Sequence, residues 1–212
     1  MNRTAPAILA ILLAFGTPAA FAASSTDLNV AGSITPSACT PTLDAAGVID
    51  FGKIPAKDLV ADVETSLPAT TLQLRVSCAA PTLFALRGKD NRAGTAHKDD
   101  GYGYGLGLNN GDEKVGTYLL TVRNPVSDSA RVIPLISTNN GELWLGFPLG
   151  VWLTGHTLAA FGNEDSGVTA PVALTTVTAD LFVETRIAPA NGLTLDREVP
   201  LDGSATLELL YL

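Results

Sequence analysis

The sequence predicts an all-β protein, and three observations support this fold class. Apolar residues alternate with polar ones over many short segments, and Gly, Pro, Asn or Asp interrupts them about every 8 to 12 residues. No stretch keeps the 3.6-residue period of an amphipathic helix. The chain has two cysteines, one in the clearest apolar strand segment. This rhythm is typical of a sandwich or a closed sheet.

The chain begins with a predicted signal peptide, residues 1–22. Arg3 supplies the basic start, and the apolar run 7–15 is too short to span a bilayer. Ala20-Phe21-Ala22 fits the small-x-small cleavage rule, with cleavage after Ala22 or after Ala23. We therefore expect an exported protein without stable membrane insertion.

Residues 23–35 are predicted to form an N-terminal arm ahead of a single domain, 36–212. Within the arm, Leu28, Val30, Gly32 and Ile34 lie on one face at the two-residue period of a strand. The arm is either an ordinary first strand of the domain or a donor strand that pairs with another molecule. The pattern alone leaves both interpretations open.

The domain is predicted to contain strands at intervals along its whole length. In the clearest of them, Leu72, Leu74, Val76 and Cys78 share one face and should point into the core. The segments 102–108 and 115–122 look like a hairpin whose turn contains Asn110-Gly111. The other expected strands are 48–51, 82–87, 178–187, 198–201 and 205–212. The region 125–170 is less regular, and we interpret it as an elaboration of the same domain.

An even cysteine count in an exported chain predicts a disulfide between Cys39 and Cys78. It would hold the first strand of the domain beside the strand that ends at Cys78. No CxxC motif or metal-type Cys/His spacing occurs, so we expect no metal.

The sequence contains no recognisable catalytic motif, and we expect neither catalysis nor a cofactor. His97 and His156 are the only histidines, and no GxSxG, HExxH or Walker pattern is present. The glycines at 101, 103, 105 and 107 are not followed by a helix, so a phosphate cradle is not indicated. They instead predict a strand face that another backbone or ring approaches closely.

The chain is acidic, with 13 basic and 21 acidic residues and a net charge of −8. Loss of Arg3 with the signal peptide leaves 12 against 21, or −9. This balance argues against binding to nucleic acid and to anionic lipid surfaces.

Both ends of the predicted mature chain resemble the subunits of chaperone–usher pili. In that family an alternating apolar arm surrounds a glycine, and the first cysteine follows seven residues later, as Cys39 follows Gly32. The second cysteine ends an early core strand, and a tyrosine stands next to the chain end, as Tyr211 does here. The chain is also similar to an uncharacterised group of fimbrial proteins of Gram-negative bacteria. The resemblance covers about residues 27–87 and 178–212.

The resemblance implies an immunoglobulin-like sandwich that lacks its last strand. A periplasmic chaperone would lend a strand, and an outer-membrane usher would pass the subunit into a surface fimbria. There the arm of the next subunit, with Leu28, Val30, Gly32 and Ile34, would replace the chaperone strand. Leu207, Leu209 and Tyr211 would line or flank the groove, and the Leu212 carboxylate would anchor on the chaperone.

A second interpretation is a self-contained secreted β-sandwich that serves as a binding or adhesive module. Such a protein would keep its own first strand and need no partner. Its binding surface would lie in the region 125–170, which contains Trp144 and Trp152.

Overall fold

The computed structural model describes residues 29, 38–98, 100–128, 131–163 and 169–212. All strands described below belong to one of the two compact units into which the chain divides, Thr35–Leu212. The signal peptide and the arm residues Leu28, Val30, Gly32 and Ile34 lie outside the described residues. Within the described part, no helix is both long and apolar enough to cross a membrane.

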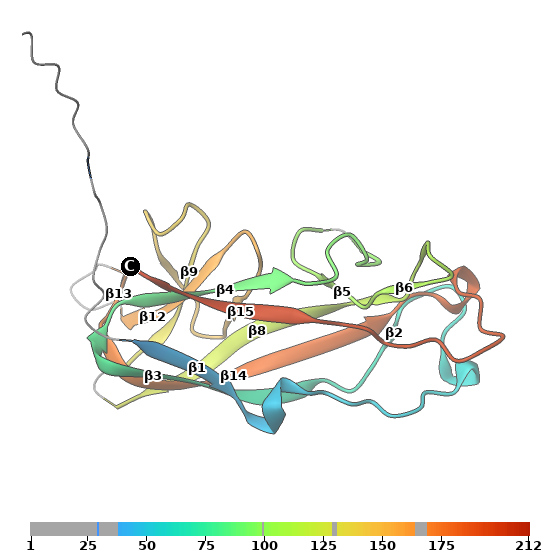
Figure 1. Ribbon diagram of the computed structural model, residues 1–212, viewed down its shortest axis with the longest axis horizontal. Coiled ribbons are helices and arrows are strands. Elements are labelled where there is room, and N and C mark those ends of the chain that lie inside the picture. The colour runs from blue at the N-terminus through green and yellow to red at the C-terminus, as the bar shows by residue number, and fades with distance from the viewer. Residues whose placement is uncertain (1–28, 30–37, 99, 129–130, 164–168) are drawn as a thin grey trace, which may run out of the picture. The chain divides into compact units, whose positions relative to one another are not determined.

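Two antiparallel sheets make up the domain (Figure 1). The first has the order β1-β3-β14-β8-β11, with β2 beside β14 and β5 beside β8. Its strands are β1 (Cys39–Leu43), β2 (Thr65–Ser66), β3 (Thr70–Thr82), β5 (Tyr104–Gly105), β8 (Gly116–Ser127), β11 (Val151–Trp152) and β14 (Leu174–Ile187).

The second sheet has the order β10-β9-β12-β4-β15, with β13 beside β12. Its strands are β4 (Phe84–Asp90), β9 (Ile133–Ser137), β10 (Leu145–Gly146), β12 (Leu158–Asn163), β13 (Ala170–Pro171) and β15 (Ala205–Tyr211). A separate small hairpin consists of β6 (Leu108–Asn109) and β7 (Glu113–Lys114). The described residues also contain three short 3₁₀ segments: η1 (Asp44–Gly47), η2 (Ala56–Asp58) and η4 (Ala190–Gly192).

The main core lies between the two sheets. Val76 of β3, Val122 of β8 and Leu181 of β14 point inward from the first sheet, and Leu86 of β4 and Phe161 of β12 point inward from the second. In β3 and β14 buried residues alternate with exposed or half-buried ones, which is the pattern of strands covered on one face. The sequence-based prediction of an all-β fold is therefore confirmed.

The strand order is that of an immunoglobulin-like sandwich. The run β1-β3-β14-β8 corresponds to strands A-B-E-D, and β4-β15 corresponds to strands C-F. Among the described residues no strand occupies the position that strand G takes beside strand F. That position would lie along the outer edge of β15.

The disulfide between Cys39 and Cys78 is confirmed. The two residues are direct partners in the ladder between β1 and β3, and the Cys78 side chain is buried in the main core. The bond therefore fixes the first strand of the domain to a central strand. It uses both cysteines, and neither remains as a free thiol.

The glycine-rich segment is confirmed as a place of close approach, although only β5 within it is a strand. A Cβ atom at Gly103 would lie 2.3 Å from the Thr117 methyl carbon, and one at Gly105 would lie 2.0 Å from Thr95 Oγ1. The predicted hairpin of 102–108 with 115–122 is confirmed: β5 pairs with β8 at Tyr104↔Tyr118 and Gly105↔Thr117, and β6 with β7 extends the hairpin to its turn. Its turn residues Asn110 and Gly111 have φ of 53° and 92°, as an Asn-Gly turn requires.

Two predicted strands are wrong. The segments 48–51 and 198–201 belong to no sheet in the described structure. Both are short apolar segments that run along the open edge of the sandwich, where neither has a neighbouring strand to pair with.

Candidate functional site

The outer edge of β15 is the first wall of the candidate site. β15 pairs only with β4 among the described strands, from Ala205↔Asp90 to Tyr211↔Phe84. No residue of β15 is fully buried, whereas most residues of its neighbour β4 are. Leu207 and Leu209 nevertheless pack against the main core. The last strand thus presents an unpaired backbone edge beside apolar side chains.

The second wall begins where β1 ends. Among the described strands β1 pairs only with β3, and it stops at Leu43. Ala45, Ala46 and Gly47 follow with φ of 46°, 52° and 72°, an unusual left-handed run that turns the chain out of the sheet. The next segment, residues 48–55, then continues along the sandwich edge without a sheet partner in the described structure.

Between these two walls the core is open to the outside. A cavity of about 270 Å³ separates Leu43, Ile49 and Phe51 on one side from Leu201 and Leu207 on the other. Its floor consists of core side chains from the inner face of the first sheet, namely Leu72, Leu120, Leu181 and Val183. A strand beside β15 would cover these side chains in a complete sandwich.

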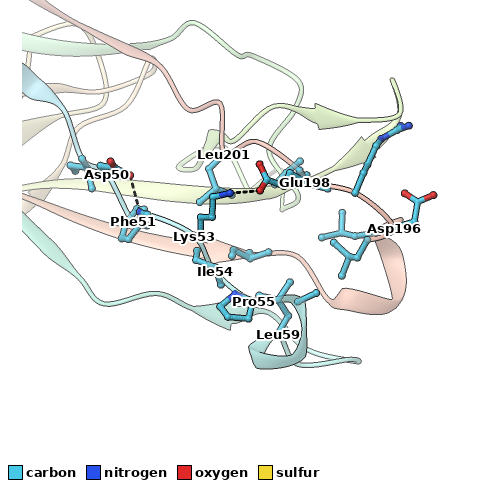
Figure 2. A pocket seen from close by; sticks show the side chains of 18 residues that line it. Asp50, Phe51, Lys53, Ile54, Pro55, Leu59, Asp196, Glu198 and Leu201 are labelled. Atoms are coloured by element: carbon cyan, nitrogen blue, oxygen red, sulfur yellow. Dashed lines mark hydrogen bonds and ion pairs between the residues drawn. The ribbon is translucent and has the colours of Figure 1, made fainter.

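A second cavity, of about 660 Å³, shares Ile49, Phe51 and Leu201 with the first. It extends the first cavity beyond Ala205, where β15 begins. Figure 2 shows its walls, with Phe51, Ile54, Pro55 and Leu59 on one segment and Asp196, Glu198 and Leu201 on the other. We call the two joined cavities the edge groove. Its lining is largely apolar, with charged groups mainly where it widens.

One ion pair crosses the edge groove. Lys53 Nζ contacts Glu198 Oε1, so the two walls are linked where the groove widens (Figure 2). Both side chains are more than four-fifths exposed, and an exposed pair of this kind contributes about 0–1 kcal/mol. The link between the two walls is therefore weak.

At Cys39, where β1 begins, the two walls of the groove come together. The Cys39 backbone N–H donates to the Tyr211 hydroxyl at 3.0 Å. The Leu212 N–H donates to the Leu83 carbonyl at 3.1 Å, which carries the chain past the end of the sheet. The edge groove is thus narrow at the disulfide end and open at the other.

A carboxylate clamp fixes the segment 193–201, which lines the wide end of the groove on the side of β15. Glu113 accepts hydrogen bonds from the Thr194 N–H at 2.8 Å and the Thr194 hydroxyl at 2.6 Å. The Asn109 and Asn110 side-chain amides donate to the same carboxylate. The bonds from Thr194 and Asn110 favour the charged form and lower the pKa of Glu113 to about 2.

Tyr118 lies at the edge of the groove floor, stacked on Tyr104 with ring centroids 5.1 Å apart. Burial raises the pKa of both phenols, and the nearby Asp90 raises them further. Both rings are therefore neutral at ordinary pH, which suits an apolar surface.

The structure places the predicted site residues in different ways. Leu207 lines the edge groove, Leu209 packs on the core beside it, and Tyr211 lies where β15 meets β1. Leu212 is 49% exposed. The predicted donor residues fall outside the described part of the chain.

Sequence reasoning missed residues in both walls of the groove. Ile49, Phe51 and Leu201 lie in segments that looked like ordinary strands, because each is short and apolar. The left-handed run at Ala45 and Ala46 carries no signal in its residue types, since alanine is rare at positive φ.

The edge groove combines an unpaired strand edge with an apolar floor. In the described residues no group of three or more His, Cys, Asp or Glu side chains is placed to hold a metal ion. The groups that the groove exposes are the unpaired backbone edge of β15 and apolar side chains.

Three comparisons relate the chain to known proteins. The family described as "Protein of unknown function (DUF1120)" matches residues 28–119, less than half of the chain. The chain is 28% identical over 253 aligned residues to Protein GltF of Escherichia coli K12, an alignment that covers 100% of this chain and 98% of GltF. It is 24% identical over 229 aligned residues to Uncharacterized protein YhcF of the same strain, covering 94% and 95%. GltF and YhcF are thus homologues along nearly their whole length.

Proposed function

We propose that this protein is a structural subunit of a surface fimbria and that its edge groove receives a strand from another polypeptide. One observation carries the proposal: the outer edge of β15 has no strand partner in the described structure, and it borders a floor of core side chains. The resemblance of both chain ends to pilus subunits supports the same function.

A strand entering the edge groove gains two kinds of interaction. Its backbone can pair with the free N–H and C=O groups of β15, and every second side chain can reach the apolar floor. Each Leu, Ile or Val that becomes fully buried contributes roughly 1.5–3 kcal/mol before the cost of ordering the strand. The arm of a second copy offers Leu28, Val30 and Ile34 at this spacing.

An open strand edge beside apolar surface is also an aggregation hazard. We therefore propose that a periplasmic chaperone covers the groove until an outer-membrane usher joins the subunit to its neighbours. The partners are then other fimbrial subunits, of the same or a different kind. The site of action is the periplasm and afterwards the cell surface.

The test uses protein that begins at Thr35 and a synthetic peptide covering residues 25–35. We expect a large, saturable rise in melting temperature when the peptide is added, because it completes the sandwich. A peptide with Gly32→Leu should give little rise, since the resemblance places Gly32 against a shallow part of the groove. The protein variant Leu207→Asn should also respond weakly, because it places a polar group in the groove wall.

If the shortened protein does not fold alone, the peptide can be fused behind Leu212 through a long flexible linker. The fusion should then restore a folded monomer, and the Gly32→Leu fusion should not. A stable shortened monomer that ignores the peptide would contradict the proposal and favour the self-contained binding module.

A further inference from the structure

We propose that a second site, on the outer face of the second sheet, binds a sugar that carries a carboxylate. The site is a cavity of about 310 Å³ between the outer face of β4, the segments 93–96 and 101–104, and the loop 154–156. We call it the outer pocket. It shares no lining residue with the edge groove, so this proposal is independent of strand exchange. Its volume is at the lower end of the range for small-molecule sites, roughly 300–1,000 Å³.

An exposed aromatic pair stands at the rim of the outer pocket. Tyr102 lines the pocket, and its ring centroid lies 5.0 Å from that of Trp152 at an interplanar angle of 55°. The two residues are 44% and 48% exposed, although rings of this size are usually much more buried. Such rings offer an apolar face to the C–H groups of a pyranose.

Four polar side chains around the outer pocket make no hydrogen bond or ion pair within the described structure. Arg87 and Glu208 are direct partners in the ladder between β4 and β15, and both point away from the core, since Leu207 and Leu209 point into it. No hydrogen bond or ion pair joins the side chains of Arg87, Lys89, His156 or Glu208 to any described residue. They are therefore free to bind a ligand.

Two of the three charged side chains of the pocket that have no bonding partner in the described structure are cations. Arg87 and Lys89 are cations, and Glu208 is the only free carboxylate of the pocket. Asp90 also lines it, but its two oxygens accept the Arg92 N–H at 2.8 Å and the Gly105 N–H at 2.9 Å. The four charges of the pocket sum to zero, and the two cations are the charged groups left available to an anionic substituent of a ligand.

These features fit a uronic or sialic type of sugar better than a neutral one. The planar Arg87 guanidinium can form a paired contact with a carboxylate, which a neutral sugar lacks. Glu208 and His156 can bind hydroxyl groups while the ring lies on Tyr102. A flat apolar partner would leave the four polar side chains unused.

The walls of the outer pocket are held before any ligand arrives. The Tyr104 hydroxyl donates to the Leu153 carbonyl at 2.7 Å, and the Gly88 N–H donates to the Thr154 carbonyl at 3.2 Å. Asp90 joins Arg92, just before the segment 93–96, to Gly105, just after the segment 101–104, through its two backbone bonds. A preformed site of this kind loses little entropy on binding.

The test is calorimetric titration of the protein beginning at residue 23 with matched pairs of sugars. Trigalacturonate is compared with its methyl ester, and sialyllactose with lactose. We expect at least one acidic sugar to bind about tenfold or more tightly than its neutral partner, because a charge-assisted contact is lost in the neutral form. Added salt should weaken the acidic sugar's binding.

Variants locate the site. Arg87→Gln should weaken binding of the acidic sugar about tenfold, and Arg87→Lys should have an intermediate effect because it keeps the charge but loses the fork. Trp152→Ala should also weaken binding. The matched controls are Lys57→Gln and Phe147→Ala, an exposed cation and an exposed ring outside the pocket.

All variants should unfold at temperatures close to that of the unaltered protein, since the changed side chains are half-buried or exposed. Equal binding of acidic and neutral sugars would overturn the proposal. So would unchanged binding by Arg87→Gln, or the absence of binding by both acidic sugars.

Discussion

Glu113 shows how one surface carboxylate shapes the edge groove. Two of its four hydrogen bonds join the hairpin of β6 and β7 to Thr194, and the other two lie within the hairpin. These bonds stabilise the carboxylate, so the pKa in the folded protein is about 2 instead of 4.5. Because the pKa is lowered on folding, the contribution is complete above about pH 4.5 and is lost as the pH falls toward about 2.

The first prediction follows from the lowered pKa of Glu113 in the folded protein. Glu113→Gln should lower the melting temperature at neutral pH, and the gap to the unaltered protein should narrow as the pH falls from about 4.5 to about 2. The measurement is thermal unfolding of both proteins across that range. Asp112→Asn is the matched control, because this neighbouring carboxylate is exposed and should show little gap. A gap of constant size at every pH would contradict the prediction.

At Gly105 the surrounding atoms leave no room for a side chain. A Cβ atom there would lie 2.8 Å from the Arg92 carbonyl oxygen and 2.9 Å from the Ala96 nitrogen, besides its clash with Thr95. Backbone atoms at this distance cannot move aside without shifting the loop that borders the outer pocket.

We therefore expect Gly105→Ala to destabilise the protein by about 1–3 kcal/mol, the usual cost of overpacking. Urea unfolding measures the change. Gly192→Ala serves as the control, since a Cβ atom there meets nothing within 4 Å. Equal stability of the two variants would show that the loop adapts to the added methyl group.

At the scale of elements, the disulfide decides how firmly β1 is held. β1 has only β3 as a strand partner in the described structure, and it forms the closed end of the edge groove together with Tyr211. The bond closes a loop with a sequence separation of 39 residues. For a loop of that length the chain-entropy account gives a stabilisation of about 4 kcal/mol.

Replacing both cysteines, Cys39→Ala with Cys78→Ala, should therefore lower the free energy of unfolding by about 4 kcal/mol. Reduction of the unaltered protein should give a similar loss, which separates the effect of the crosslink from that of the side chains. Urea unfolding with and without reductant makes both measurements. A loss below about 1 kcal/mol would mean that packing alone holds β1.

The elements differ in how readily the sequence predicts them. β3 and β14 follow from strict alternation, because each is buried on one face only. β12 shows no alternation, because its Leu158 and Ala160 are covered by Trp144 on the outer face while Ala159 and Phe161 face the main core. A strand buried on both faces is a continuous apolar run, so neither its type nor its limits can be derived from periodicity.

At the scale of the whole molecule, the fold class and the disulfide are predictable from the sequence, and the candidate sites are not. The edge groove depends on how far the segments after Leu43 and before Ala205 diverge, which is a property of the assembled sheets. The outer pocket brings Arg87, Tyr102 and His156 together from distant parts of the chain. Sequence patterns describe residues that are close along the chain, so they do not predict contacts between residues that are distant in sequence.

The crosslink between β1 and β3 also bears on chemical durability. It uses both cysteines, and the only methionine of the chain is Met1, within the predicted signal peptide. The exported part would then hold no thiol and no thioether, the two groups that peroxides attack most readily in proteins. A protein of this composition suits a place where oxidants are common and where no cellular enzyme can repair the damage.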